Sequence, residues 1–345
     1  LKEENATDIV ARRVLKKLAE PFLLGNDLVH LTGSIGIVET YPNETIDAET
    51  LIKYADIAMY ESKQQGRNRY TKFDQSMLHK AQQRSTLIND IHRALKDNEF
   101  QVVYQPIIDI ETNQILKAEA LIRWHHPVEG LINPDDFISV AEDAGLIIDV
   151  GNWVFKQVVK QVAVWRETIH PDFQISINKS PVQLNEVDAR KLDWLACLET
   201  YGVPGEGVII EITESVLLNK NTLETNRLSA LRDAGMQISL DDFGTGYSSL
   251  SHLLKMDIDY IKIDQSFIKN LSDNAEDFAI CEAMIVMAHK LGIKVVAEGV
   301  ETQQQLKFLS DAGCNFVQGF LLAKPLSSKA FERLCKKSEE SSMIA

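Results

Sequence analysis

Between about residues 100 and 320, short runs rich in β-branched residues alternate with longer amphipathic stretches. The runs are Gln101–Ile108, Ile115–Arg123, Phe173–Asn178, Val208–Thr213, Met236–Asp242, Tyr260–Asp264, Ile293–Glu298 and Phe316–Phe320. Eight strand-like runs joined by helical crossovers predict a closed (β/α)₈ barrel, a TIM-like α/β fold. An open doubly wound sheet is the alternative, but no Gly-x-Gly-x-x-Gly follows the first strand.

Residues 1–74 predict a smaller α/β unit. Apolar residues at helical spacing indicate one helix that ends before Pro21 and a second that ends at Gly66. The stretch between them, residues 28–38, is β-like, so this unit has a thin core. Residues 75–97 are polar and lack Gly and Pro, which predicts a helical connector. The predicted domains are therefore residues 1–74, a helical linker at 75–87 and the barrel at 88–345.

The composition is that of an ordinary globular protein. Of 345 residues, 45% are hydrophobic and 25% are charged, and 36 Lys and Arg against 50 Asp and Glu give a net charge of −14. The length suits about two domains. The acidic balance argues against the basic surface that a long nucleic acid needs. An anionic ligand would require another source of attraction, such as a bound metal ion.

Cysteine usage and hydropathy bear on location. The four cysteines lie far apart without Cys-x-x-Cys spacing, which is typical of packing thiols in a reducing cytoplasm. No apolar run approaches the ~18 residues of a membrane span, and no secretory signal is visible. We therefore expect a cytoplasmic fragment without membrane contact. Because the chain starts at Leu1, we expect it to be a piece of a longer protein that could itself be membrane-anchored.

Nearly every predicted strand of the barrel ends in an acid, an amide or a lysine. These side chains are Glu119, Asn178, Glu211, Asp241, Asp242, Lys262, Asp264, Glu298 and Gln318. A single acid at a strand end is usually a helix cap or a turn residue, but capping does not explain the whole set. In a (β/α)₈ barrel the carboxyl ends of the strands meet on one face, where active sites are built. The pattern therefore predicts one shared site.

Oxygen ligands dominate this predicted site. Crowded carboxylates repel one another at low dielectric, and divalent cations relieve that repulsion. The set contains no His or Cys, which favours Mg²⁺ or Mn²⁺ over Zn²⁺. Two ions about 4 Å apart that share one carboxylate are typical of phosphoester hydrolysis. Lys262 alternates with Asp264 on one strand face, where it can hold the attacking water or stabilise developing negative charge.

A series of motifs resembles the EAL family of cyclic di-GMP phosphodiesterases. Glu119-Ala120-Leu121, within EALIRW, resembles the family's signature. The other matching segments are YQPI from Tyr104, NKSPVQL from Asn178, EITES from Glu211, DDFGTGYSSL from Asp241, KID from Lys262, AEGVE from Ala297 and QGF from Gln318. The resemblance covers roughly residues 88–335, and no catalytic position departs from the family's pattern.

The resemblance implies a barrel whose first strand runs antiparallel to the others. It also implies a cyclic-guanylate-specific phosphodiesterase of bacterial second-messenger signalling, which hydrolyses cyclic di-GMP to linear 5′-pGpG. Two Mg²⁺ or Mn²⁺ ions are implied, with ligands Glu119, Asn178, Glu211, Asp241, Asp242 and Glu298. Asp241 is expected to bridge the two ions.

Further roles are carried over from the same resemblance. The implied catalytic residues are Lys262, Glu298, Asp241 and Glu301, with Lys262 assisting the attacking water. The implied substrate-binding residues are Gln105, Leu121, Arg123, Asp264 and Gln318. Arg123 is the natural partner for a substrate phosphate. Glu214 is expected to anchor the loop at residues 242–250, which couples dimerisation to activity in the family.

The first segment resembles the carboxyl half of a GGDEF domain. The resemblance rests on Ser34-Ile35-Gly36, on ADIAMY from Ala55, and on Lys63, Gly66, Arg67 and Asn68. The amino half of such a domain, with its Gly-Gly-Asp-Glu-Phe loop, is not in this chain. We therefore expect no cyclase activity from the chain as it stands.

Two other functions stay open at this point. A non-catalytic receptor could bind cyclic di-GMP without cleaving it, although degenerate family members usually lose metal ligands and none is lost here. A different barrel hydrolase could act on other phosphodiesters.

The family also tends to form homodimers through the barrel near the loop after the fifth strand, where Leu250, Leu253 and Leu254 could supply an apolar contact.

Overall fold

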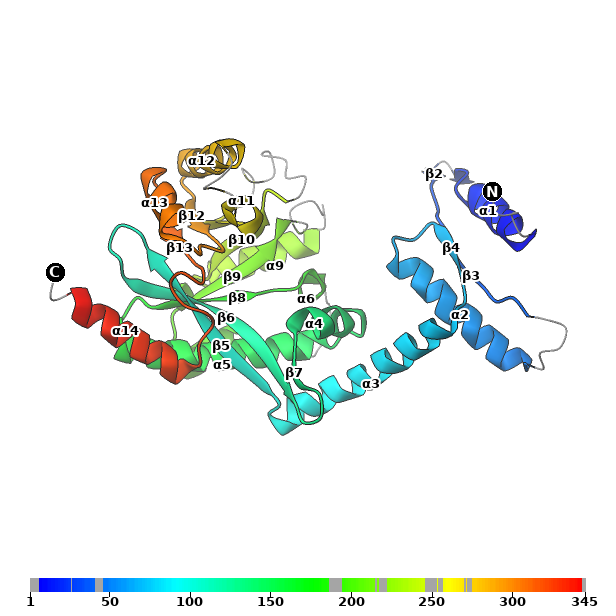
Figure 1. The fold of residues 1–345 in the computed structure, drawn as a ribbon, viewed down its shortest axis with the longest axis horizontal. Coiled ribbons are helices and arrows are strands. Elements are labelled where there is room, and N and C mark those ends of the chain that lie inside the picture. The colour runs from blue at the N-terminus through cyan, green and yellow to red at the C-terminus, as the bar shows by residue number, and fades with distance from the viewer. Residues whose placement is uncertain are drawn as a thin grey trace. The chain divides into compact units, whose positions relative to one another are not determined.

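The computed structural model describes residues 6–25, 27–40, 46–185, 194–214, 216, 222–245, 253, 257–269, 271 and 275–342. The chain divides into two compact units, Leu1–Asp90 and Ile91–Ala345 (Figure 1). Helix α3 (Gln75–Asp97) is continuous and contributes residues to both units. Its uninterrupted course agrees with the absence of Gly and Pro from this segment.

The first unit consists of helices and two small sheets. Its elements before α3 are α1 (Ala6–Leu18), β1 (Phe22–Leu24), β2 (Asp27–Val29), β3 (Ser34–Ile37), α2 (Ala48–Gln64) and β4 (Arg69–Lys72). Strands β1 and β2 pair antiparallel, and β3 and β4 pair parallel. A Cβ on Gly36 would stand 1.9 Å from the carbonyl oxygen of Ala55, so only glycine lets β3 pack this closely on α2.

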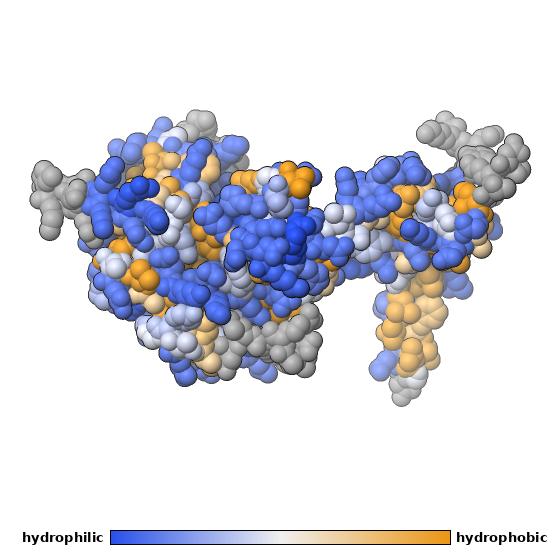
Figure 2. Space-filling model, turned by 90° about the horizontal axis from the view of Figure 1, so that it is seen from below, coloured by the Kyte–Doolittle hydropathy of each residue, from blue (hydrophilic) through white to orange (hydrophobic). Residues whose placement is uncertain are grey.

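The core of the first unit is small, as the sequence predicts. Among its described residues, the fully buried ones are Ala11, Ala58 and Ser62. Leu23 and Leu24 of β1 are 74% and 67% exposed. Figure 2 shows hydrophobic residues gathered on a projecting segment of this unit. The unit therefore leaves much of its apolar surface uncovered by its own described residues.

The second unit is a closed barrel of eight strands. They are β5 (Phe100–Asp109), β6 (Ile115–His126), β8 (Gln174–Asn178), β9 (Val208–Thr213), β10 (Gln237–Phe243), β11 (Tyr260–Ile263), β12 (Lys294–Ala297) and β13 (Phe316–Val317). The pairing order is β5-β13-β12-β11-β10-β9-β8-β6, and β6 pairs back with β5, which closes the barrel. Strand β5 is antiparallel to both neighbours, whereas the remaining neighbours are parallel. The predicted barrel with an antiparallel first strand is confirmed.

Helices surround the barrel (Figure 1). They are α4 (Pro134–Asp143), α5 (Ile147–Thr168), α6 (Pro181–Asn185), α7 (Trp194–Tyr201), the 3₁₀ turn η1 (Gly205–Gly207), α9 (Thr222–Asp233), α11 (Gln265–Lys269), α12 (Ala275–Lys290), α13 (Gln303–Asp311) and α14 (Ser328–Ser342). Trp165 of α5 stacks on Phe331 of α14 with ring centroids 4.5 Å apart, and meets Phe173 edge-on. All three rings are fully buried. Burial of each contributes about 2–3 kcal/mol, so this cluster fixes α5 and α14 to the strands.

Side chains fill the inside of the barrel in layers. One buried layer consists of Ile107, Ile209, Tyr260, Val296 and Phe316. Side chains alternate along a strand, so the residues two positions further toward the carboxyl ends of the parallel strands also point inward. Those residues are polar. The mainly apolar layer is therefore the floor of the predicted site.

Some details differ from the sequence-based expectations. The pattern does not reveal β1, β4 or β7 (Gly130–Ile132), a strand that pairs antiparallel with the end of β6. Each has three or four residues, too few for alternation to show. Leu253, expected at a dimer contact, is 2% exposed and packs in the core of the chain itself. Leu250 and Leu254 lie outside the described residues.

The four cysteines are all buried and free of disulfides. Burial raises the pKa of Cys281 to about 11 and that of Cys314 to about 12, which keeps these two thiols protonated. They serve as apolar packing groups.

Within the described part of the chain, none of the helices combines the length and apolar character needed to cross a membrane.

Candidate active site

Lys262 of β11 lies at the centre of the polar layer above the barrel floor. Its side chain is 1% exposed. The distances from its Nζ are 2.6 Å to Glu298 Oε1, 3.0 Å to Glu211 Oε2, 3.2 Å to Asp241 Oδ1 and 3.5 Å to Glu119 Oε2. Glu119, Glu211 and Asp241 come from β6, β9 and β10, and Glu298 directly follows β12. Closure of the barrel therefore gathers predicted residues that are distant in sequence.

Amide side chains fix the orientation of Glu119. Gln318 Nε2 donates to Glu119 Oε2 at 2.6 Å, and Asn178 Nδ2 donates to Glu119 Oε1 at 2.8 Å. Gln318 Nε2 also lies 3.1 Å from Gln105 Oε1, and Gln105 Nε2 donates to the carbonyl of Ala323 at 3.3 Å. Both oxygens of Glu119 are therefore held in place by the chain itself.

The ionisation of this cluster shows an excess of negative charge. Burial raises the pKa of Glu211 well above its ordinary value, and repulsion from the neighbouring carboxylates adds to the rise. Burial also raises the pKa of Glu298 to about 7. Although burial opposes it, the attraction of Lys262 and the two amides lowers the pKa of Glu119. The surrounding carboxylates outweigh burial at Lys262 and raise its pKa well above its usual value. One ammonium shared by four carboxylates leaves room for further positive charge.

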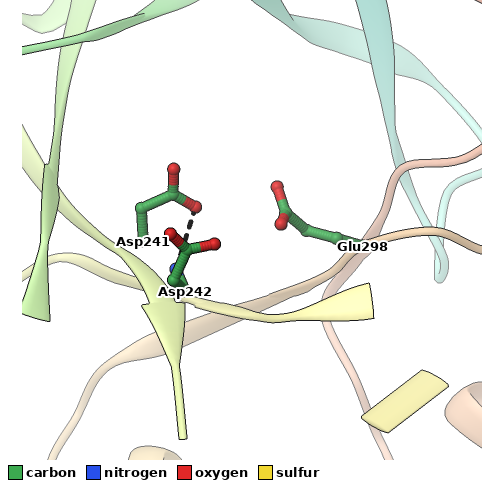
Figure 3. A group of neighbouring side chains, drawn as sticks. All are labelled: Asp241, Asp242 and Glu298. Atoms are coloured by element: carbon green, nitrogen blue, oxygen red, sulfur yellow. Dashed lines mark hydrogen bonds between the residues drawn. The ribbon is translucent and has the colours of Figure 1, made fainter. Parts of the chain in front are cut away.

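Asp241, Asp242 and Glu298 form a compact group beside this cluster (Figure 3). Each offers a carboxylate oxygen, and these oxygens lie within 4.8 Å of one another. Asp242 is exposed, whereas Asp241 and Glu298 are half-buried. The group can therefore be reached from solvent while its inner side is continuous with the buried centre.

A β-bulge places Asp241 and Asp242 on the same side of β10. Consecutive residues of a regular strand point to opposite faces. The register of β10 against β11 shifts between Leu240 and Phe243, and Asp242 has a left-handed backbone with φ of 54°. The Asp242 amide donates to Asp241 Oδ1 at 3.1 Å (Figure 3). The acidic pair is visible in the sequence, but the bulge that turns both carboxylates to the same side of the strand is not.

The residues present fit hard divalent cations. The donor set consists of carboxylate and amide oxygens, the ligands that Mg²⁺ and Mn²⁺ prefer. Gln318 Oε1 is buried and has no hydrogen-bond partner among the described residues, so the centre holds an unused oxygen acceptor. The predicted ligands Asn178 and Glu211 are paired in register on β8 and β9. The expectation of an oxygen-rich metal site is therefore compatible with the geometry.

Two of the predicted substrate-binding residues lie further along β6. Leu121 and Arg123 follow Glu119 at intervals of two, which places all three on the same face of the strand. Both are half-buried, and Arg123 Nη1 donates to the carbonyl of Ile122 at 2.8 Å. A contact between Arg123 and a phosphate stays a prediction.

Three predicted residues are less closely joined to the centre. Asp264 Oδ1 accepts from the amide of Ser266 at 3.0 Å, which makes it a cap for α11. The Glu301 side chain is exposed. Among the described contacts, neither carboxylate is within ion-pair distance of Lys262. Glu214 is buried directly after β9, but residues 246–250 of the loop that it is predicted to anchor lie outside the described residues.

The strand-end pattern does not reveal two other polar residues inside the barrel, Lys117 and Tyr260. They precede Glu119 on β6 and Lys262 on β11 by two positions each, so they lie on the same inward faces. Both are buried, and Lys117 Nζ lies 3.0 Å from Tyr260 Oη. Extending the two-residue alternation toward the amino ends of the strands would have found them.

Family comparisons agree with the motifs. The EAL domain profile matches residues 88–325, and the profile of the diguanylate cyclase GGDEF domain matches residues 1–69. The bifunctional diguanylate cyclase/cyclic di-GMP phosphodiesterase MucR of Pseudomonas aeruginosa is 36% identical over 321 residues, which are 93% of this chain and 46% of MucR. The cyclic di-GMP phosphodiesterase PdeR of Escherichia coli K12 is 36% identical over 336 residues, covering 97% of this chain and 50% of PdeR. The chain thus spans about half the length of these curated relatives.

Structural comparison points the same way. The solved structure of the PaMucR phosphodiesterase in complex with c-di-GMP is 35% identical in sequence, with a TM-score of 0.66. The match covers 71% of this chain and 99% of that one. Since the EAL profile also covers well over half of the residues and the barrel carries the family's motifs at its strand ends, this chain belongs to the EAL domain family.

Proposed function

We propose that this chain is a cyclic di-GMP phosphodiesterase that uses two divalent ions, Mg²⁺ or Mn²⁺, to produce linear 5′-pGpG. The observation that carries the proposal is the buried ammonium of Lys262 among four carboxylates at the carboxyl ends of the barrel strands. The names of MucR and PdeR state activity on cyclic di-GMP, and the PaMucR structure is of a c-di-GMP complex, which supports the choice of substrate.

The reaction opens one of the two phosphodiesters of the cyclic dinucleotide. The oxygen of a water molecule bonds to phosphorus, the bond from phosphorus to one ribose oxygen breaks, and that oxygen takes up a proton. Negative charge builds on the phosphoryl and leaving oxygens during this exchange. When bound, two divalent ions stabilise that charge and lower the pKa of water.

The residues of the chain have distinct tasks in this proposal. Those that would hold the ions are Glu119, Asn178, Glu211, Asp241, Asp242 and Glu298. The ammonium of Lys262 donates a hydrogen bond to the attacking water and stabilises the developing negative charge. Arg123 pairs with a phosphate oxygen, and its fork of donors suits that geometry. Gln105 and Leu121 contact the bound dinucleotide.

The experiment that tests this function follows conversion of cyclic di-GMP to linear 5′-pGpG by chromatography. The whole chain is assayed with Mg²⁺, with Mn²⁺ and with a chelator. Glu119→Gln is the decisive variant, because glutamine has nearly the same size and shape as glutamate but carries no charge. We expect the rate of 5′-pGpG formation to fall by at least about 100-fold when chelator is added, and by a similar factor in the variant. A loss of this size is typical when one electrostatic contact to the transition state is removed.

A matched control is Glu167→Gln, the same substitution at an exposed position on α5, which should retain the parental rate. Binding of cyclic di-GMP is measured in parallel. If the parent binds the dinucleotide with either metal but never cleaves it, the chain is a receptor and the enzymatic proposal is wrong. If it cleaves other phosphodiesters equally well, the substrate assignment is wrong.

A further inference from the structure

A polar cavity lies at the amino-terminal end of the barrel strands. Its volume is about 320 Å³, and its walls include Lys117, Gln174, Gln237, Tyr260 and Lys294. Lys117 lies near the start of β6, and the other four are the first residues of β8, β10, β11 and β12. The acidic centre is at the opposite ends of these strands, so the two sites are separate.

The position of the cavity follows from the alternation along β12. Lys294 lines the cavity, Val296 belongs to the apolar layer inside the barrel, and Glu298 belongs to the acidic centre. Residues at intervals of two share a face of the strand. The apolar layer therefore stands between the cavity and the site proposed for phosphodiester hydrolysis.

Lys117 is a buried cation that forms no ion pair with any described carboxylate. Lys117 is 8% exposed, and its Nζ donates hydrogen bonds to Gln174 Oε1 and Tyr260 Oη. It also lies 4.9 Å and 5.1 Å from the ring centroids of Tyr260 and Phe316. Within the described part of the chain, no carboxylate comes within ion-pair distance of this ammonium. Burial, together with the nearby charge of Lys294, lowers the pKa of Lys117 to about 8, although the negative charge of Asp109 opposes this shift.

Two further cations face the same cavity. Arg166 of α5 and Lys294 of β12 line it together with Lys117, so positive groups from three elements converge. Asp172 and Glu206 are also on the wall, but both are exposed, and Asp172 is 4.0 Å from Arg166. Neither acid reaches the buried ammonium. The wall thus carries three cations against two exposed acids, and Asp109 adds a further negative charge near Lys117.

The polar side chains around Lys117 are held in a fixed network. Gln174 Nε2 donates to the carbonyl of Glu206 at 2.6 Å and to Gln237 Oε1 at 2.5 Å. Tyr260 Oη donates to Gln237 Oε1 at 3.2 Å. These bonds orient the amides without neutralising the lysine. The recess is therefore organised, and the described partners of the Lys117 ammonium are neutral oxygens.

Stability of the barrel does not account for this arrangement. A buried charge without a partner of opposite sign is destabilising, and an apolar side chain of similar size would pack at lower free energy. A bound anion removes that penalty, because it supplies charge and hydrogen-bond acceptors to the ammonium and to the guanidinium of Arg166. The volume admits a small oxyanion and excludes a cyclic dinucleotide lying wholly inside.

We propose that this amino-terminal recess binds a small oxyanion of the phosphate type, with Lys117, Arg166 and Lys294 as its cationic ligands. Inorganic phosphate and the terminal phosphate of a mononucleotide share this chemistry. Free phosphate can enter the recess completely, whereas a mononucleotide would leave its base at the mouth. This inference does not depend on the proposed phosphodiesterase activity.

The test is calorimetric titration of the whole chain with inorganic phosphate in the presence of a chelator, so that no divalent ion at the acidic centre attracts the anion. A second titration with guanosine monophosphate separates the two sources of phosphate. Lys294→Met is the principal variant, because Lys294 is exposed and its loss leaves the core intact. Lys117→Met is the second variant, and Lys290→Met, at the end of α12, is the matched control.

We expect one saturable phosphate site per chain. Binding should weaken by about 10-fold in Lys294→Met, the loss typical of one charge-assisted contact, and by more in Lys117→Met. It should be unchanged in Lys290→Met and in Asp241→Asn, which alters the acidic centre. Equal affinity in Lys294→Met and the parent would overturn the assignment. So would the absence of saturable binding of either probe to the parent chain.

Discussion

A single side chain, Lys262, organises the acidic centre. Four carboxylates surround its Nζ, and a charged group this deeply buried is stable only because the opposite charges are in contact with it. The same arrangement leaves the cluster negative overall. The lysine is therefore the residue that lets the barrel tolerate its buried acids and, in the proposed function, a donor to the attacking water.

Replacement of Lys262 by Met tests the structural part of this role. The side-chain length is similar, but the ammonium is lost, so buried carboxylates remain without compensation. We expect the free energy of unfolding to fall by about 3–5 kcal/mol in chelator at pH 8. Urea denaturation followed by circular dichroism measures it, with Lys290→Met as the control for loss of a lysine.

Two conditions should reduce this loss of stability. In the proposed function Mg²⁺ binds the folded state, so its addition should recover part of the lost stability. Acidification should also reduce it, because the raised pKa values of Glu211 and Glu298 mean that the folded chain takes up protons at these groups more readily than the unfolded chain. The variant should therefore approach the parent in stability as pH falls below about 7. An unchanged urea midpoint at pH 8 would contradict this account of Lys262.

At the scale of one element, the bulge in β10 decides whether the sequence Asp-Asp can serve a site. A regular strand would turn one of the two carboxylates away. The left-handed conformation of Asp242 is unfavourable for residues with a Cβ, and its carboxylate lies near Asp241 and Asp264, whose charges add to burial in raising its pKa. The strand is thus strained where it supports the site.

Asp242→Gly separates the strain from the chemistry. Glycine adopts positive φ without steric penalty, so we expect the metal-free chain to gain up to about 1 kcal/mol in stability. The same variant lacks a carboxylate that the proposed function assigns to metal binding, so it should lose affinity for Mg²⁺ or Mn²⁺ as well as phosphodiesterase activity. Thermal denaturation with chelator and calorimetric titration with Mn²⁺ give the two readouts.

Asp242→Asn is the matched comparison for this prediction. Asparagine adopts the left-handed conformation about as readily as aspartate and keeps the side-chain shape, so mainly the charge changes. It should lose metal affinity while its backbone strain stays. If Asp242→Gly bound Mn²⁺ as tightly as the parent, Asp242 would not be a ligand and the bulge would have another purpose.

At the scale of the whole molecule, association of two barrels remains a prediction of the family resemblance. Leu253 does not supply surface for it, since it is buried within its own chain. A homodimer would therefore have to use other residues near the end of β10. We expect light scattering of the full chain at micromolar concentration to give about twice the mass of one chain, with cyclic di-GMP favouring the dimer. A monomeric mass both with and without cyclic di-GMP would show that dimerisation is not a property of this chain.

Much of the barrel can be predicted from local pattern. The eight predicted runs each contain or overlap a strand, and β9 has the predicted bounds, because buried strands require continuous β-branched segments between turns. The antiparallel course of β5 came from family resemblance alone, since alternation along a strand carries no information on its direction. The three-residue strands β1 and β7 were invisible for lack of length.

By itself, the sequence determined the chemistry of the centre, because residue identity fixes which oxygens and which cation are available at each strand end. How these groups are used depends on the three-dimensional fold. Barrel closure brought Lys262 into contact with Glu119 and Glu298, and the bulge turned Asp242 toward them. It also buried Lys117 at the opposite end of the barrel. Contacts between distant strands arise from closure and register, and those depend on the packing of the whole chain.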